Sequence, residues 1–188
     1  MMDIFIETTP VFSEKVRSFS KSLLQVVLGS FFLALCAKVT IPMQPVPLSL
    51  QTLGVFILAM MIGGRNAGLA GLLYLAQATV GLPVLAAGAN PLWMFGPTAG
   101  YLVAFPIAAY VIGTLVEKKS DSSLWVMFSI FCGQLIIYVL GALFLSRLIG
   151  MKMAVSLGVL PFLPLAGFKL ILATSMSGLY LRIKKKFA

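Results

Sequence analysis

The chain has 188 residues, of which 60% are hydrophobic and only 10% are charged, and its net charge is +9. A soluble domain usually carries about 25% charged residues, so this composition excludes a soluble globule and leaves lipid as the main solvent. A spanning helix takes roughly 20 apolar residues. We therefore expect an all-α, polytopic membrane protein with about six transmembrane helices in a single transmembrane domain over residues 1–188.

Residues 1–21 are polar and are expected to form a cytoplasmic N-terminal segment that does not read as a cleaved signal peptide. The predicted core covers residues 22–183, and a basic cytoplasmic tail follows over 184–188. Apolar runs predict helices over 22–41, 49–63, 67–81, 98–116, 123–148 and 161–183. Prolines 42, 45 and 47 predict an extended loop between the first two helices.

Residues 82–97 form an uncharged stretch that contains three prolines and two glycines. Irregular backbone at membrane depth is tolerated only where it is buried in protein or faces a cavity. The segment is therefore the first pointer to a binding site, although an ordinary exposed loop is the alternative.

The basic residues lie at the ends of the apolar runs, which favours topogenic charge over nucleic-acid binding. With the predicted helices, ten Lys and Arg residues fall on one side of the membrane and three on the other, and Lys169 lies within the last helix. The excess predicts a multi-pass protein of the cell (plasma) membrane with both termini in the cytoplasm. The proline loop and residues 82–97 then both face outward.

Lys169 is the candidate for a functional charge, because it interrupts an apolar helix at a cost of roughly 2.5–3.5 kcal/mol. The alternative is a lysine that extends to the outer interface. All five acidic residues fall on the cytoplasmic side and the chain has no His. A buried Lys169 would therefore take its counter-ion from an anionic ligand, such as a carboxylate.

The same inventory argues against an enzyme. It contains no phosphate-binding loop and no nucleophile beside a base. We therefore predict no catalytic residue, no metal site and no cofactor, and any transport requires energy from another protein.

Neutral side chains complete the predicted site. Gln51 and Asn90 offer amide donors and acceptors. Aromatic side chains that could wall a ligand, or simply pack at the membrane interface, are Tyr74, Tyr101 and Trp93. Ser30, Ala34 and Ala37 form a stripe of small residues on the first helix, which serves either internal packing or docking of another membrane protein.

Three blocks in register carry a family resemblance: residues 41–54 (IPMQPVPLSLQTLG), residues 74–88 (YLAQATVGLPVLAAG) and residues 96–102 (GPTAGYL). The chain resembles the BioY family, the biotin-binding S components of energy-coupling factor (ECF) transporters. The resemblance spans about residues 22–183. It implies a six-helix S-component fold, and it adds Gly88 to the predicted substrate-binding residues.

The resemblance also implies a function and partners. The expected function is high-affinity capture of biotin on the outer side and its import by an ATP-driven complex. The expected partners are a membrane coupling subunit, docked through the stripe of Ser30, Ala34 and Ala37, and ATP-hydrolysing subunits.

The chain departs from the family at one position. Family members carry an Asp three residues before the lysine that Lys169 matches, and this chain has Ala166. An S component for a ligand related to biotin therefore stays open. An autonomous secondary transporter of a small anionic vitamin is the other alternative, although the membrane segments lack residues for proton coupling.

Overall fold

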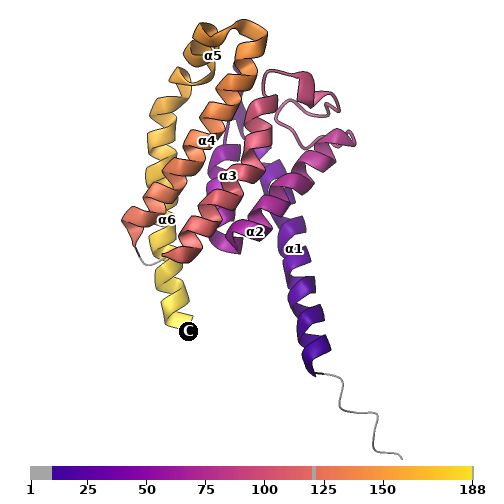
Figure 1. Ribbon diagram of the computed structural model, residues 1–188, viewed down its shortest axis with the longest axis vertical. Helices are drawn as coiled ribbons and strands as arrows, with labels where there is room; N and C mark the ends of the chain where they lie inside the picture. Colours follow the sequence, from indigo (N-terminus) through magenta and orange to yellow (C-terminus); the bar gives the residue numbers. More distant parts are fainter. Residues whose placement is uncertain (1–9, 120–121, 188) are drawn as a thin grey trace, which may run out of the picture.

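The computed structural model describes residues 10–119 and 122–187, with side chains over 15–119 and 122–175. The elements in chain order are α1 Pro10–Lys38, β1 Thr40–Ile41, β2 Leu48–Ser49, α2 Gln51–Thr79, η1 Trp93–Phe95, α3 Ala99–Lys118, α4 Ser123–Ile149, α5 Met151–Gly158, η2 Leu160–Phe162 and α6 Leu163–Phe187. Figure 1 shows a helical bundle in which α5 and the loop after α2 lie at one end. The first turns of α1 and the last turns of α6 lie at the other end.

The predicted count of six transmembrane helices needs correction. Within the described residues, five helical stretches are long and apolar enough to cross a membrane. The difference arises because the two helices predicted over 49–63 and 67–81 are joined at a kink into one element, α2, and are counted as a single stretch. Only Gly63 leaves helical geometry, with φ +80° and ψ 167°.

The chain nevertheless reverses direction within α2. Four pairs of neighbours on α1 and α2 show the reversal: Cys36 with Gly54, Gly29 with Leu58, Ser22 with Asn66, and Ser30 with Gln77. Positions before Gly63 run antiparallel to α1, and positions after it run parallel to α1. Gly63 is therefore a sharp bend between two antiparallel arms, and it lies inside the turn predicted from the sequence.

α1 starts earlier than predicted. The sequence divides a polar segment over 1–21 from a helix that begins at residue 22, whereas α1 is continuous from Pro10. Residues 1–9 and residue 188, at the end of the predicted basic tail, lie outside the described part of the chain.

Small residues let the helices approach closely. Gly71 on the second arm of α2 lies against Pro106 of α3, and Gly100 of α3 lies against Phe144 of α4. A β-carbon at either glycine would meet atoms 3.1 Å away or less. The second arm of α2, α3 and α4 therefore form a tightly packed layer, as small residues allow in membrane bundles.

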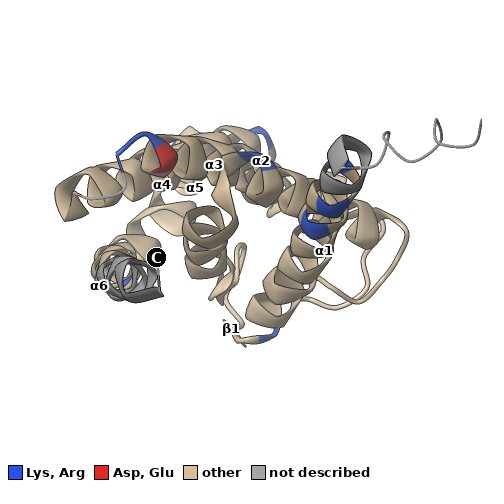
Figure 2. Cartoon of the chain, turned by 90° about the horizontal axis from the view of Figure 1, so that it is seen from below, with Lys and Arg blue, Asp and Glu red and all other residues tan. Residues whose placement is uncertain are grey.

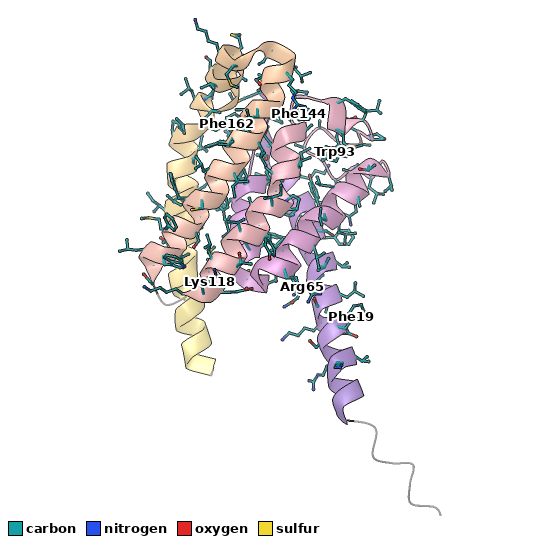
Figure 3. The ribbon with its side chains drawn as sticks, in the orientation of Figure 1. Phe19, Arg65, Trp93, Lys118, Phe144 and Phe162 are labelled. Carbon is teal, nitrogen blue, oxygen red and sulfur yellow. The ribbon has the colours of Figure 1, made fainter. Side chains whose placement is uncertain are left out.

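Large apolar side chains cover the outside of the bundle. Leu35 on α1 is 69% exposed, Leu124 on α4 is 74% exposed, and Phe168 on α6 is 62% exposed. Such surfaces suit lipid rather than water. Arg65 and Lys118 lie instead at the end of the bundle where α1 begins and α6 ends (Figure 3). Figure 2 shows further basic residues on α1 near this end.

Candidate ligand-binding site

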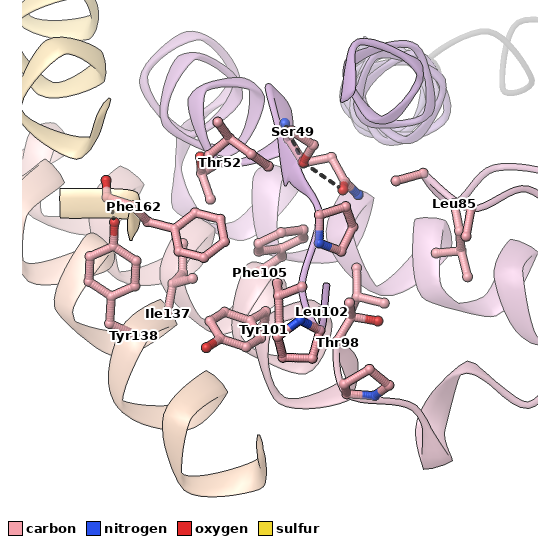
Figure 4. A pocket seen from close by; sticks show the side chains of 18 of the residues that line it. Ser49, Thr52, Leu85, Thr98, Tyr101, Leu102, Phe105, Ile137, Tyr138 and Phe162 are labelled. Carbon is pink, nitrogen blue, oxygen red and sulfur yellow. Dashed lines mark hydrogen bonds between the residues drawn. The ribbon is translucent and has the colours of Figure 1, made fainter. Parts of the chain in front are cut away.

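A cavity of about 230 Å³ lies at the end of the bundle opposite Arg65 and Lys118. Its wall comes from the hairpin loop between β1 and β2, the first turn of α2, the loop after α2, and the helices α3, α4 and α6. In Figure 4, Tyr138 and Phe162 flank one side, Leu85 lies at the other, and Tyr101 and Phe105 lie between them. Most of the wall is apolar, with a few polar side chains, as in small-molecule sites.

Lys169 lines this cavity and is only 6% exposed, so its side chain does not extend to the interface. Its Nζ donates to the backbone oxygen of Ser49 and to Oγ1 of Thr52, both at 2.7 Å. An ammonium group has three N–H donors, so one remains for a further acceptor. Among the described residues that line the cavity, Lys169 is the single charged side chain.

Gln51 also lines the cavity and is held from two sides. Its Oε1 accepts from Ser49 Oγ at 2.9 Å, and its Nε2 donates to the hydroxyl of Tyr74 at 2.7 Å. Tyr74 is fully buried behind the wall and donates in turn to the backbone oxygen of Val84 at 3.2 Å. Tyr74 therefore supports the wall and does not form part of it.

Tyr101 forms part of the wall, and its hydroxyl donates to the backbone oxygen of Gly158 at 2.8 Å. On the neighbouring helix, Tyr138 donates to the backbone oxygen of Phe162 at 3.2 Å. The two tyrosines thus tie α3 to the end of α5 and α4 to η2.

The loop after α2 contributes one predicted residue to the wall and places two others outside it. Asn90 lines the cavity on its exposed side, where its Oδ1 accepts from Leu92 N at 3.1 Å. Gly88 adopts φ +90°, and this turn presents the neighbouring residues Ala86 and Ala87 to the cavity. Trp93 is buried and donates from Nε1 to Thr79 Oγ1, so it anchors the loop to α2.

Several wall residues were not predicted from the sequence. Among them are Ser49, Thr52, Thr98, Phe105, Gln134, Ile137, Tyr138 and Phe162. Gln134, Ile137 and Tyr138 follow helical i, i+3, i+4 spacing, which places them on one face of α4. That spacing was readable from the sequence, but nothing in the sequence indicated which face of the helix turns toward a cavity.

The stripe of small residues on α1 packs mainly within the chain. Ser30 and Ala37 are fully buried and Ala34 is half-buried. Ser30 Oγ accepts from Gln77 Nε2 at 3.2 Å. The burial of Ser30 and Ala37 fits internal packing, the other interpretation of the stripe, and docking through these residues stays a prediction.

The apolar surface, the spanning helices and the inner cavity define a multi-pass membrane protein with a small-molecule site. Its fold matches a crystal structure of the S component for biotin from an ECF-type ABC transporter, with a TM-score of 0.78 and 24% identity. The match covers 90% of this chain and 93% of the other.

The model of the BioY family matches residues 8–186, and the chain belongs to this family. It is 38% identical to the biotin transporter BioY of Thermotoga maritima, over 86% of this chain and 96% of the relative. It is 35% identical to the probable biotin transporter BioY of Pyrococcus horikoshii, over 74% of this chain and 85% of the relative. The family predicted from the three sequence blocks is thereby confirmed.

Proposed function

We propose that this chain captures biotin from the outer side of the membrane and delivers it inward as the S component of an ECF-type transporter. The proposal rests mainly on the position of Lys169, which is a buried cation in the wall of an apolar cavity. Among the described residues of that wall there is no acidic side chain to pair with it. The names of the relatives and the matched S-component fold support the same substrate.

Biotin suits the chemistry of the cavity. It combines an aliphatic chain and a thiophane ring, which pack on apolar walls, with a carboxylate and a cyclic urea. Lys169 retains one N–H donor that can bind the carboxylate. Asn90 offers its amide nitrogen on the exposed side of the cavity, and Gln51 fixes the hairpin side of the wall.

The proposed complex contains a membrane coupling subunit and two ATP-hydrolysing subunits. This chain carries no phosphate-binding loop, so ATP hydrolysis has to come from partner proteins. We also propose that both termini lie in the cytoplasm, since Arg65 and Lys118 lie at the bundle end where α1 begins and α6 ends.

Equilibrium binding of biotin to the purified chain in detergent tests the proposal. We expect tight binding by the native chain, and binding weakened at least about tenfold, or about 1.4 kcal/mol, in Lys169→Met. Methionine keeps most of the aliphatic volume and removes the charge. Asn90→Ala is expected to weaken binding in the same direction.

Lys152→Met is the matched control, because Lys152 is exposed on α5 and does not line the cavity. We expect it to bind as the native chain does. Native binding that Lys169→Met leaves unchanged would keep the substrate and refute the role of Lys169. No binding by a folded native chain would refute biotin as the ligand.

A further inference from the structure

One segment of the cavity wall, residues 83–87, is held in place by side chains of the neighbouring helices. Its last three residues line the cavity. Among the described residues, its backbone-to-backbone hydrogen bonds reach only Leu82 and Gly88, which belong to the same loop. The position of this wall segment therefore depends on what the helices donate to it.

Three successive carbonyl groups of the wall segment accept hydrogen bonds from helix side chains. Pro83 O and Leu85 O accept from Nζ of Lys38, at 2.5 and 3.1 Å. Val84 O, between them, accepts from the hydroxyl of Tyr74 at 3.2 Å. Side chains of α1 and of the second arm of α2 thus hold the same three residues.

Lys38 is the last residue of α1 and does not line the cavity. An ammonium group has three N–H donors, and Lys38 gives two of them to carbonyls that lie 45 and 47 residues further along the chain. Hydrogen bonds from a charged donor are stronger than neutral ones. We propose that Lys38 is a positioning residue for the ligand site: it fixes the wall segment on which the ligand packs without touching the ligand.

A wall that is already in place when the ligand arrives loses little freedom on binding. Without Lys38, the wall segment keeps its bond to Tyr74 and loses two bonds to α1. The segment then leaves its position more often, and a bound ligand dissociates faster. A cation in the last turn of a helix also stabilises that helix, but this role by itself predicts no local effect on the wall segment.

Labelling of a buried cysteine in the ligand-free chain tests the local effect. Cys36 and Cys132 are replaced by alanine, and Leu85→Cys then places a thiol where the native side chain is only 5% exposed. We expect a thiol reagent to label this cysteine at least about fivefold faster in Lys38→Met, because local opening exposes buried groups. Lys38→Arg keeps charged N–H donors and is expected to restore the labelling rate to within about twofold.

Two matched controls accompany this measurement. Ile130→Cys, at a fully buried position on α4, is expected to label equally slowly with and without Lys38. Lys152→Met removes an exposed cation that does not line the cavity, and it is expected to leave the labelling of Leu85→Cys unchanged. Lys38→Ala gives the same readout should the Met variant not fold.

Dissociation of bound biotin from the chain with its native Leu85 tests the effect on the ligand, and this second measurement rests on the proposed function. We expect dissociation to be at least about fivefold faster in Lys38→Met, with association changed by less than about twofold. Lys38→Arg is expected to recover slow dissociation, and Lys152→Met is expected to keep it.

The outcomes separate the two proposals. Equal labelling of Leu85→Cys with and without Lys38 would overturn the role of Lys38, and so would an equal acceleration at Ile130→Cys. Faster labelling with unchanged dissociation of biotin would also overturn it, because the segment would then move without consequence for the ligand. Failure of the folded native chain to bind biotin would overturn the proposed function and leave the labelling result intact.

Discussion

Tyr74 supports the cavity wall from behind, through one hydroxyl that joins two segments of the chain. The hydroxyl accepts from Gln51 and donates to Val84, and both contacts are buried. In Tyr74→Phe both partners lose a hydrogen bond inside the protein, at a cost of about 1–3 kcal/mol. We expect thermal unfolding in detergent to shift down by several degrees, at about 2–4 °C per kcal/mol for a chain of this size.

Tyr110→Phe is the control for this change. Tyr110 lies on α3 and is 53% exposed, so loss of its hydroxyl is expected to leave the unfolding temperature within about one degree. We also expect Tyr74→Phe to weaken biotin binding, because Gln51 would lose one of its two supports. Equal unfolding temperatures for the two variants would contradict the supporting role of Tyr74.

Charge gave the strongest signal for a site residue, and the neutral amides Gln51 and Asn90, which were also predicted, lie in the cavity wall as well. Lys169 stood out because a cation in an apolar helix is costly, and the structure places it in the cavity wall. Gln134 and Thr52 gave no such signal, since uncharged polar residues occur throughout membrane helices. Tyr74 and Trp93 were predicted to contact the ligand, yet both lie behind the wall, because sequence does not distinguish a residue that forms a wall from one that supports it.

At the scale of the elements, the contact between α3 and the bend of α2 depends on glycine. A β-carbon at Gly113 would lie 2.3 Å from the backbone nitrogen of Gly64 and 2.4 Å from its Cα. These atoms belong to the backbone and cannot rotate away. We expect Gly113→Ala to destabilise the chain by about 1–3 kcal/mol, measured as a lower unfolding temperature in detergent.

Gly167→Ala is the matched control on α6, where a β-carbon would meet no atom within 4 Å. Alanine favours a helix over glycine by about 1 kcal/mol, so this variant is expected to be neutral or slightly more stable. If Gly113→Ala were as stable as Gly167→Ala, this result would contradict the close contact between α3 and the bend of α2.

Hydropathy predicted the spans well and their connections less well. The turn predicted over 63–66 is limited to Gly63 in the structure. This glycine adopts a positive φ, and helical geometry resumes directly after it. The backbone N–H of Gly64 donates to Glu117 Oε1 at 3.0 Å, which satisfies a donor at the start of the second arm. Such a partner, 53 residues away, is set by tertiary packing and is invisible to a local pattern.

For the whole molecule, apolar composition was enough to predict a multi-pass protein, and linked motifs were enough to predict the family. The cavity could be anticipated in part, since the proline hairpin and the uncharged loop over 82–97 both contribute to its wall. Its closure by α4 and α6 depends on how the helices pack, which composition does not determine. The two ends of the bundle also differ from each other. One end holds the cavity, and the other holds Arg65 and Lys118.

The difference between the two ends predicts how the protein is oriented in the membrane. Cys36 and Cys132 are first replaced by alanine, and a single cysteine is then introduced as Leu92→Cys or as Arg65→Cys. Leu92 is 68% exposed in the loop beside the cavity, and Arg65 is exposed at the opposite end. We expect a membrane-impermeant thiol reagent to label Leu92→Cys in intact cells, and to label Arg65→Cys only after the membrane is permeabilised.

The physical reason is that basic residues near the ends of spans are retained in the cytoplasm, which leaves the cavity open to the outside. Biotin added to intact cells is expected to slow labelling at Ala87→Cys, because Ala87 lines the cavity, and not at Leu92→Cys, which does not. Labelling of Arg65→Cys in intact cells, with Leu92→Cys protected, would reverse the proposed orientation. The cavity would then face the cytoplasm, and capture of biotin from the outside by this conformation would be ruled out.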